Sequence, residues 1–477
     1  MICPSSLTYR PPVAGHPPHQ RHAMAATRQP DTRAGLILLQ LLFGLVVLLL
    51  AQPSQALPLF ARQTGQACVA CHVSFPELTP YGRWFKLNGY TIGKRADIPL
   101  AIMANVGVER MATPTDAAGN LQDSRDGAVS LSAASLFAGG RISDNAGAFL
   151  QWTYTPYNFN YPNPQQYGGY AHADNMDLRL VGRSEPSAEG FPDWVYGLTV
   201  HNNPTVQDVW NGTPAFGYPW QGPQFANARP AAATLIDGGL GQQAVGIGAY
   251  VYWDRTLYGE LTAYRNPQGP LNLMTWRVDA PAAPLHGTNP YLRLAYNREW
   301  GANSLEVGTY LARFALQPGQ DGDPVDRYTD SALDVQYQYI TEAHAFSVIG
   351  TAIHEHQQLD YTYGVAGGSD NASNTLDTRR VKATYFYHHT YGGSFGLFQT
   401  TGSNDATLYM VNGGLNYAVP DTRGYVAELD YQPVQNVRIL AQYTGYTRFN
   451  GGSTNVDGMG RSAHDNNVFY LDVWFAY

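Results

Sequence analysis

Hydrophobic and polar residues alternate along much of this 477-residue chain. In the run YVAELDYQ at 425–432 every second residue is apolar, and two carboxylates and an amide lie between them. The runs at 290–297 and 437–444 repeat this pattern. A period of two residues is typical of a β-strand whose side chains point to opposite faces. These runs therefore predict strands with one apolar and one polar face.

Strand-like runs of this kind recur at intervals from residue 99 to the C-terminus, and we count sixteen of them. They begin near Pro99, Gly127, Asn145, Asp174, Phe191, Gln243, Thr256, Pro290, Asn303, Arg327, Ala343, Asp377, Gly393, Gly424, Asn436 and Asn466. An even number of antiparallel strands with an apolar outer face is typical of a bacterial outer-membrane barrel, in which an apolar face meets lipid. The sequence therefore predicts an all-β, sixteen-stranded antiparallel outer-membrane β-barrel over residues 99–477.

The connections between these runs alternate in length. The long ones are 111–126, 156–173, 204–242, 267–289, 355–376, 402–423 and 448–465, and the short ones include 141–144, 254–255, 341–342, 391–392 and 434–435. Long extracellular loops and short periplasmic turns would produce this alternation, with both termini in the periplasm. The stretches 204–242 and 402–423 have room for a further hairpin.

The last ten residues, VFYLDVWFAY, favour a membrane barrel over a soluble β-sandwich. A sandwich would also show alternation, since one face of each strand would be its core. It would not explain a final strand of barrel-spanning length that ends on an aromatic residue. Trp152, Trp253, Trp300 and Tyr387 lie near expected strand ends, as in the aromatic girdles of membrane proteins.

Residues 1–56 are interpreted as a leader and signal peptide. The apolar stretch 35–51 follows several arginines and precedes Ser54-Gln55-Ala56, which has the small-x-small form of a cleavage site. A membrane anchor is the alternative, because the stretch is nearly long enough to span. The chain carries 29 Lys and Arg against 37 Asp and Glu, and it is more acidic still after residue 56. Nucleic acid is therefore not expected as a partner.

The motif Cys68-Val-Ala-Cys71-His72 carries the candidate chemistry. CxxCH is the attachment signature of a c-type haem, with two thioether bonds and one axial histidine. The only other cysteine is Cys3 in the leader. With no third thiol near the motif, a disulfide framework or a zinc knuckle is disfavoured. We expect one covalent haem c, bound by Cys68 and Cys71, with His72 as an axial ligand of the haem iron.

Other residues near the motif could complete a haem site. Pro80 and Gly89 bracket an expected helix whose Trp84 and Phe85 could pack on the porphyrin. Arg83 and Lys86 could pair with its propionates, and the equally favoured alternative is a solvated or lumen-facing role. For the second axial ligand, Met103 is favoured because it is near; a thioether there would raise the potential. The alternatives are Met111, His172, His201 and His388.

Several segments resemble the fused monohaem c-type cytochrome-porin family of the outer membrane, which includes ferrous iron oxidases. They are FARQTGQACVACHVSFPELTPYGRWFKLNGY at 60–90, PDTRGY at 420–425, FNG at 449–451 and GRSAHDNN at 460–467. The resemblance implies a short cytochrome segment, residues 57–98, that plugs the porin-like barrel of residues 99–477. It also implies that an extracellular reductant is oxidised and that electrons pass to a periplasmic c-type cytochrome or another acceptor. An Fe(II):cytochrome c oxidoreductase is one such activity.

His354 and His356 form a second candidate site, for a donor metal. They lie two residues apart near the end of an expected strand, so they share a face, and two imidazoles so placed can hold a transition metal. No hydrolytic triad, phosphate loop or paired carboxylate motif is found. Two function classes follow: outer-membrane electron transfer through haem c, or a porin-type solute channel with a redox-sensitive cytochrome plug.

Overall fold

The computed structural model describes residues 59–157, 167–187, 190–212, 222–226, 230, 232–278, 283–409 and 417–477. The expected leader and signal peptide, 1–56, therefore lie outside the described residues. No described helix has the length and hydrophobicity needed to cross a bilayer.

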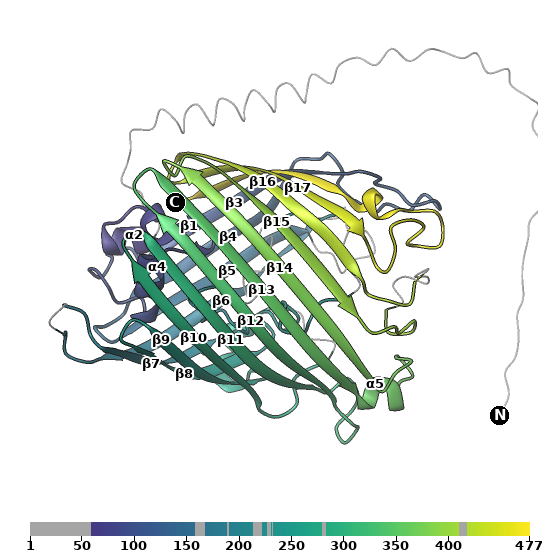
Figure 1. The fold of residues 1–477 in the computed structure, drawn as a ribbon, viewed down its shortest axis with the longest axis horizontal. Coiled ribbons are helices and arrows are strands. Elements are labelled where there is room, and N and C mark those ends of the chain that lie inside the picture. Colours follow the sequence, from purple (N-terminus) through teal and green to yellow (C-terminus); the bar gives the residue numbers. More distant parts are fainter. Residues whose placement is uncertain are drawn as a thin grey trace, which may run out of the picture. The chain divides into compact units, whose positions relative to one another are not determined.

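The main body is a closed barrel of sixteen antiparallel strands, β3 to β18, and the last strand pairs with the first (Figure 1). The first eight strands are β3 (Leu100–Met111), β4 (Ser130–Arg141), β5 (Ala146–Tyr157), β6 (Tyr167–Arg183), β7 (Trp194–His201), β8 (Val245–Trp253), β9 (Leu257–Arg265) and β10 (Asn289–Trp300). The other eight are β11 (Asn303–Leu316), β12 (Asp326–Ile340), β13 (His344–Leu359), β14 (Ser373–Tyr387), β15 (Tyr391–Gly402), β16 (Thr422–Val434), β17 (Val437–Arg448) and β18 (Val468–Ala476). The sequence prediction of a sixteen-stranded antiparallel barrel is confirmed.

Most strands begin within a few residues of their predicted starts. The largest difference is β6, which begins at Tyr167 rather than near Asp174. Residues 391–392, predicted as a turn, belong to β15; the turn is 388–390, where His388 and His389 adopt positive φ. Residue 355, predicted as the start of a loop, belongs to β13. No further hairpin is formed by the described residues of 204–242 and 402–423.

The two faces of the strands differ as predicted. On β10, Leu292 and Leu294 are exposed on the outside whereas Arg293 is fully buried toward the lumen. On β16, Leu429 is 71% exposed while its neighbour Asp430 is buried. Because a closed barrel has no unpaired edge, it satisfies its backbone groups without water. The apolar exterior and the closed ring together define an outer-membrane barrel.

Exposed aromatic residues collect at the end of the barrel that carries the short turns. Trp194 and Trp253 stack at 5.7 Å between ring centroids, and Tyr391 and Tyr431 stack at 5.3 Å. Trp300 and Tyr387 are also exposed close to these turns. Such a belt is expected where the hydrocarbon layer gives way to head groups.

The N-terminal segment, residues 59–98, lies at the short-turn end of the barrel, as does the C-terminus (Figure 1). It contains α2 (Leu59–Thr64), α3 (Cys68–Cys71), β1 (His72–Ser74), β2 (Glu77–Leu78) and α4 (Pro80–Leu87). Helix α4 begins where Thr79 caps the amide of Gly82, and Pro80 occupies its first turn, where no amide donor is needed. The predicted helix between Pro80 and Gly89 is thereby confirmed.

Lumen-facing side chains all around the ring hold this segment. Arg83 of α4 donates to Gln336 (2.9 Å) and Gln338 (2.8 Å) of β12 and to Ser304 (2.6 Å) of β11. On another side of the ring, Tyr90 donates to Asp177 of β6 at 2.6 Å. Further contacts reach β4, β8, β13 and β18. Residues 59–98 therefore extend across the lumen.

The described residues of the connection between β7 and β8 (202–212, 222–226, 230 and 232–244) also fold into the barrel. Asp208 of this connection pairs with Arg293, which also contacts Glu306 and Asp334, and all four side chains are buried. Further along, Ile236 and Leu240 pack in one buried cluster with aromatic side chains of β9, β10 and β11. The side of the lumen lined by β9 to β13 is consequently filled with protein.

Candidate functional site

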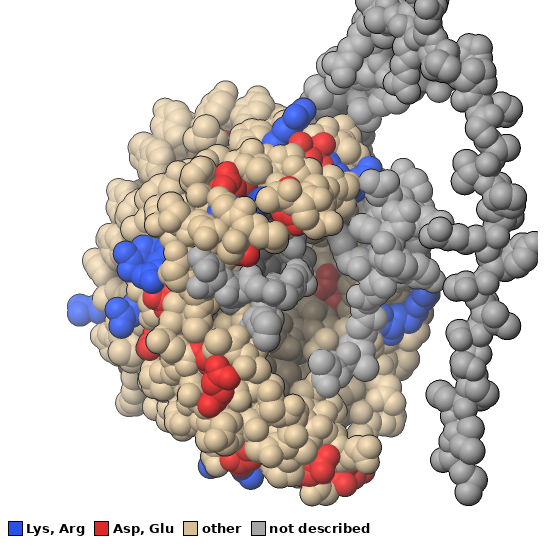
Figure 2. All heavy atoms as spheres, turned by 90° about the vertical axis from the view of Figure 1, so that its right-hand side faces the viewer, with Lys and Arg blue, Asp and Glu red and all other residues tan. Residues whose placement is uncertain are grey.

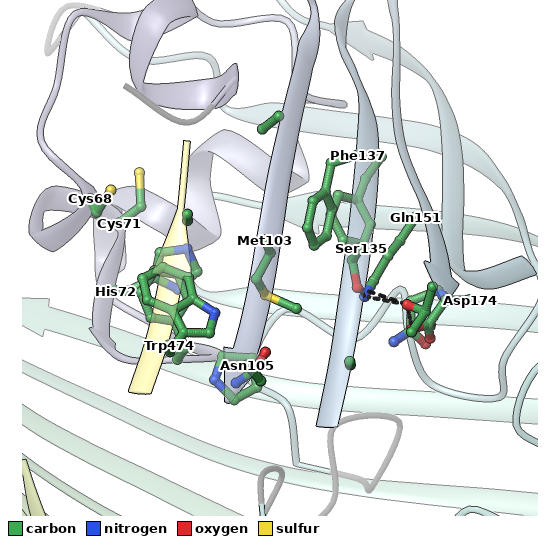
Figure 3. Close-up of a pocket in the computed structure, with 18 of the residues that line it drawn as sticks. Cys68, Cys71, His72, Met103, Asn105, Ser135, Phe137, Gln151, Asp174 and Trp474 are labelled. Atoms are coloured by element: carbon green, nitrogen blue, oxygen red, sulfur yellow. Dashed lines mark hydrogen bonds between the residues drawn. The ribbon is translucent and has the colours of Figure 1, made fainter. Parts of the chain in front are cut away.

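A cavity of about 820 Å³ lies on the other side of the lumen, between the N-terminal segment, the inward connection and the strands β3 to β6, β17 and β18. Its volume is in the range of cofactor and ligand sites. Cys68, Cys71 and His72 all line this cavity, and so does Met103 from β3. The four residues named for the haem from sequence are thus brought together on one cavity (Figure 3).

The short helix α3 carries both cysteines, one turn apart, with His72 directly after its last residue. Two contacts hold this turn against α4: Thr79 donates its backbone N–H to the carbonyl of Cys71 (2.9 Å) and its hydroxyl to the carbonyl of Ala70 (2.5 Å). Gly82 makes the close approach possible, because a Cβ there would lie 2.2 Å from the carbonyl oxygen of Cys71.

The thiols and the imidazole are partly exposed to the cavity, and their partial burial shifts their pKa values. Burial raises the pKa of Cys68 to about 11 and that of Cys71 to about 12. As free groups these thiols are neutral at neutral pH, which disfavours a reactive thiolate pair. Burial lowers the pKa of His72 to about 4, against the opposing effect of backbone hydrogen bonds at Pro76 and Glu77. A neutral imidazole is the form that ligates a metal.

Aromatic rings surround the motif. The ring of Phe75 lies 4.4 Å from that of His72 and 4.8 Å from that of Trp474 of β18, between centroids. Phe60, Phe85, Phe137 and Phe149 line the same part of the cavity. These residues give the CxxCH end of the cavity an apolar wall suited to a flat aromatic macrocycle.

Met103 is placed on the lumen face of β3. Figure 3 shows it reaching into the cavity, with His72 and Trp474 to one side and Phe137 and Gln151 to the other. The donor set on the cavity is therefore two thiols, one imidazole and one thioether. This set fits a c-type haem with His/Met ligation.

The alternative second ligands do not line the cavity. His201 is fully buried and its ring contacts the hydroxyls of Thr199 and Tyr264. His388 lies in the turn after β14. His172 of β6 and Met111 of β3 are also absent from the lining.

Of the residues on α4 expected to touch a haem, Phe85 and Lys86 line the cavity, whereas Trp84 and Arg83 do not. Trp84 packs against a cluster that includes Leu87 and Val181. The guanidinium of Arg83 donates hydrogen bonds to barrel side chains, which agrees with the lumen-facing alternative. Lys86 donates to the carbonyls of Val206 (2.5 Å) and Asp208 (3.0 Å), and burial lowers its pKa to about 8.

His354 and His356 share a face of β13, as expected, but that face is the outer one. His354 lies 3.0 Å from a carboxylate oxygen of Asp377. Within the described ranges, no group of three or more His, Cys, Asp or Glu side chains could hold a metal ion. A donor-metal site at these histidines stays a prediction.

Two parts of the site had no signal in the sequence. The inward fold of 202–244 supplies Asn211 and Gly222 to Gln224 to the cavity wall, and the stretch reads as an ordinary long loop. The polar lining from β4 and β5, including Ser135, Gln151 and Thr153, comes from side chains that are brought together by the register of the β4–β5 hairpin.

The closed sixteen-stranded ring, its apolar outer face and its polar lumen place this chain in the class of porin-like outer-membrane barrels.

No protein-family model and no curated protein matches the chain. Among solved structures, the chain is similar to OprB of Pseudomonas putida at high pH, with 8% identity, a TM-score of 0.47 and coverage of 80% of this chain and 94% of that one. It is similar to Salmonella typhi OmpF in complex with daunomycin, with 11% identity, a TM-score of 0.45 and coverage of 79% and 97%. It is also similar to a loop-deletion mutant of the Vibrio cholerae outer membrane protein OmpT, with 13% identity, a TM-score of 0.41 and coverage of 79% and 98%.

Proposed function

We propose that this barrel carries one covalent haem c in its lumen. Cys68 and Cys71 would form the thioether bonds, His72 would be one axial ligand and Met103 the second. The single observation that carries the proposal is the CxxCH motif lining an aromatic-walled cavity that Met103 also enters. Because its pKa is low, the imidazole of His72 is neutral at neutral pH. It could therefore bind the haem iron without first losing a proton.

The function proposed for this site is electron transfer across the outer membrane. When bound, the haem would supply a one-electron centre that gains one electron from a donor, which is thereby oxidised, and gives one to an acceptor. The protein would orient the haem, exclude water from it and set its reduction potential. Because about 30 Å of hydrocarbon separates the two compartments, a redox centre is useful only inside a protein that spans it. We propose an extracellular reductant, for which Fe(II) is a candidate, and a periplasmic cytochrome as acceptor.

A second candidate is a porin-type solute channel in which residues 59–98 act as a redox-sensitive plug. The barrel architecture by itself supports this function more directly than it supports electron transfer. The packing of the lumen argues the other way, since residues 59–98 extend across it and 202–244 fill the side lined by β9 to β13.

Stopped-flow reduction and single-channel conductance, measured on the same purified protein in lipid, separate the two functions. For electron transfer, a membrane-impermeant donor such as Fe(II) reduces the haem in sealed proteoliposomes, and conductance is small. The Cys68→Ala, Cys71→Ala double variant keeps the barrel and serves as the control that cannot attach haem. Large conductance, together with a haem that only permeant reductants reduce, would favour the channel instead.

A further inference from the structure

The cavity extends far beyond the volume next to the CxxCH motif. On β18 it is lined at one end of the strand by Ala476 and at the other by Val468. Eight residue steps at about 3.3 Å each correspond to about 26 Å along the strand. Because barrel strands tilt by about 35–45° from the axis, this corresponds to about 20 Å along the axis, against about 30 Å for the hydrocarbon layer. The cavity therefore extends from the short-turn end along much of the lumen toward the long loops.

The chemistry of the lining changes along this length. At the short-turn end the walls are aromatic, with Phe137 of β4 and Phe149 of β5. Further along the same two strands the lining residues are Ser132, Thr153 and Thr155. Hydroxyl and amide groups lower the cost of keeping water in a narrow space, whereas apolar walls favour a dry one. The half toward the long loops is therefore hydrophilic.

One carboxylate borders this hydrophilic half. Asp174 of β6 accepts a hydrogen bond from Thr153 (2.5 Å), and Thr153 lies 3.3 Å from the amide nitrogen of Gln151. Among the described residues that line the cavity, Lys86 is the only Lys or Arg, and it comes from α4 in the N-terminal segment. A wall with a carboxylate and neutral hydrogen-bonding groups admits cations and neutral solutes more readily than anions.

The long-loop end, seen in Figure 2, is hollowed near its centre and carries both acidic and basic side chains around the hollow. The connections 317–325, 360–372 and 403–421 contain aspartates and no lysine or arginine. Asp360 and Asp421 pair with the strand-end residues Arg327 and Arg448. The remaining acidic charge at the rim favours the approach of cations.

We propose that the hydrophilic half of this cavity is an access conduit, through which small neutral or cationic solutes pass from the long-loop end to the CxxCH site. The conduit runs between the wall formed by β3 to β6, β17 and β18 and the described part of the inward connection that lines the cavity, Asn211, Gly222 to Gln224 and Ala226. The proposal rests on the proposed function for its purpose, since such a conduit would bring a small donor into direct contact with the haem site. Its existence does not require the haem.

Cysteine accessibility tests the conduit without any haem. The protein is prepared with Cys3, Cys68 and Cys71 replaced by alanine and reconstituted in lipid nanodiscs, so that both ends face solvent. A single cysteine is then introduced as Gln151→Cys, inside the conduit, or as Leu136→Cys, on the lipid-facing side of β4. Labelling rates are measured with small cationic and anionic methanethiosulfonates and with a maleimide that carries a large polymer.

We expect Gln151→Cys to react with the small reagents and not with the polymer reagent, and Leu136→Cys to react with none of them at a comparable rate. The cationic reagent should react several-fold faster than the anionic one, and Asp174→Asn should remove most of that preference. Adding Ser132→Phe, which narrows the conduit near the long loops, should slow labelling of Gln151→Cys at least tenfold. Absence of labelling, or labelling that Ser132→Phe leaves unchanged, overturns the proposal.

A second measurement connects the conduit to the proposed function. In the haem-loaded protein with native cysteines, Ser132→Phe should slow reduction by a small external donor at least tenfold and leave the absorption spectrum unchanged. Leu136→Phe, on the opposite face of the same strand, should have no effect. If no haem is attached at all, the proposed function fails while the labelling result stands. If haem is attached and Ser132→Phe changes neither rate, the conduit fails while the haem assignment stands.

Discussion

Gly82 should control how firmly the CxxCH turn is held, and Gly82→Ala is the sharpest test of the local packing. The new Cβ would lie 2.2 Å from the carbonyl oxygen of Cys71 and 3.0 Å from its carbonyl carbon, so α4 or α3 must move. Overpacking of this kind costs about 1–3 kcal/mol. Alanine offsets part of this, because replacing glycine reduces the entropy of the unfolded chain by about 0.4–1 kcal/mol.

The net expectation is a loss of about 1–2 kcal/mol in the local stability of residues 59–98, a factor of about 5–30 in the opening equilibrium. Hydrogen–deuterium exchange of this segment in lipid measures it, since exchange through local opening reports that equilibrium. Gly364→Ala is the matched control. Gly364 is also helical, in α5 (Asp360–Gly364), and a Cβ there meets nothing within 4 Å. Equal exchange of 59–98 in wild type and Gly82→Ala would refute the reasoning.

Three further changes test other parts of the account. Arg293→Met leaves the buried carboxylates of Asp208, Glu306 and Asp334 without their cation and should destabilise the barrel by about 3–5 kcal/mol. The urea midpoint of unfolding, followed by the heat-modifiable gel band of the folded barrel, measures this loss. An unchanged midpoint would contradict the expectation. Leu429→Arg puts a charge on the lipid face and should cost up to about 2–4 kcal/mol, whereas Leu429→Ala should cost less; equal midpoints for the two variants would argue against lipid contact there. Burial lowers the pKa of Lys86 from its ordinary value of 10.5 to about 8 in the folded protein. Between these two pH values the folded state binds fewer protons than the unfolded state. The free energy of unfolding should therefore rise from about pH 8 to pH 10. Protease protection of residues 59–98 should show this rise in wild type but not in Lys86→Met; the same pH profile in both would refute the assignment to Lys86.

The barrel could be predicted from the sequence because its signal is repeated in every strand. Alternation places Leu292 and Leu294 outside and Arg293 inside without knowledge of any partner strand, and an even number of such strands is typical of a closed outer-membrane barrel. The error at β6 has a local cause. Pairing of β5 with β6 shifts register between Leu150 and Trp152, so the alternation is interrupted there and the strand start was placed too late.

Only those parts of the site that are formed by residues adjacent in sequence could be predicted. CxxCH is such a signal, and the helix between Pro80 and Gly89 is another. The sequence does not show that Trp84 lies away from the cavity, because both sides of α4 meet protein and periodicity does not say which side meets the cavity. The inward fold of 202–244 depends on contacts such as Asp208 with Arg293, which are far apart in sequence and appear only once the barrel is closed.

The measurement that tests the central claim most directly is a search for covalent haem on the purified outer-membrane protein. The protein should be produced with the machinery that attaches haem c, denatured, and examined by pyridine haemochrome and by haem staining of the gel band. We expect one haem per chain that survives denaturation and disappears in the Cys68→Ala, Cys71→Ala double variant. A folded, heat-modifiable barrel that carries no covalent haem under these conditions, or a stain that persists in the double variant, would contradict the account.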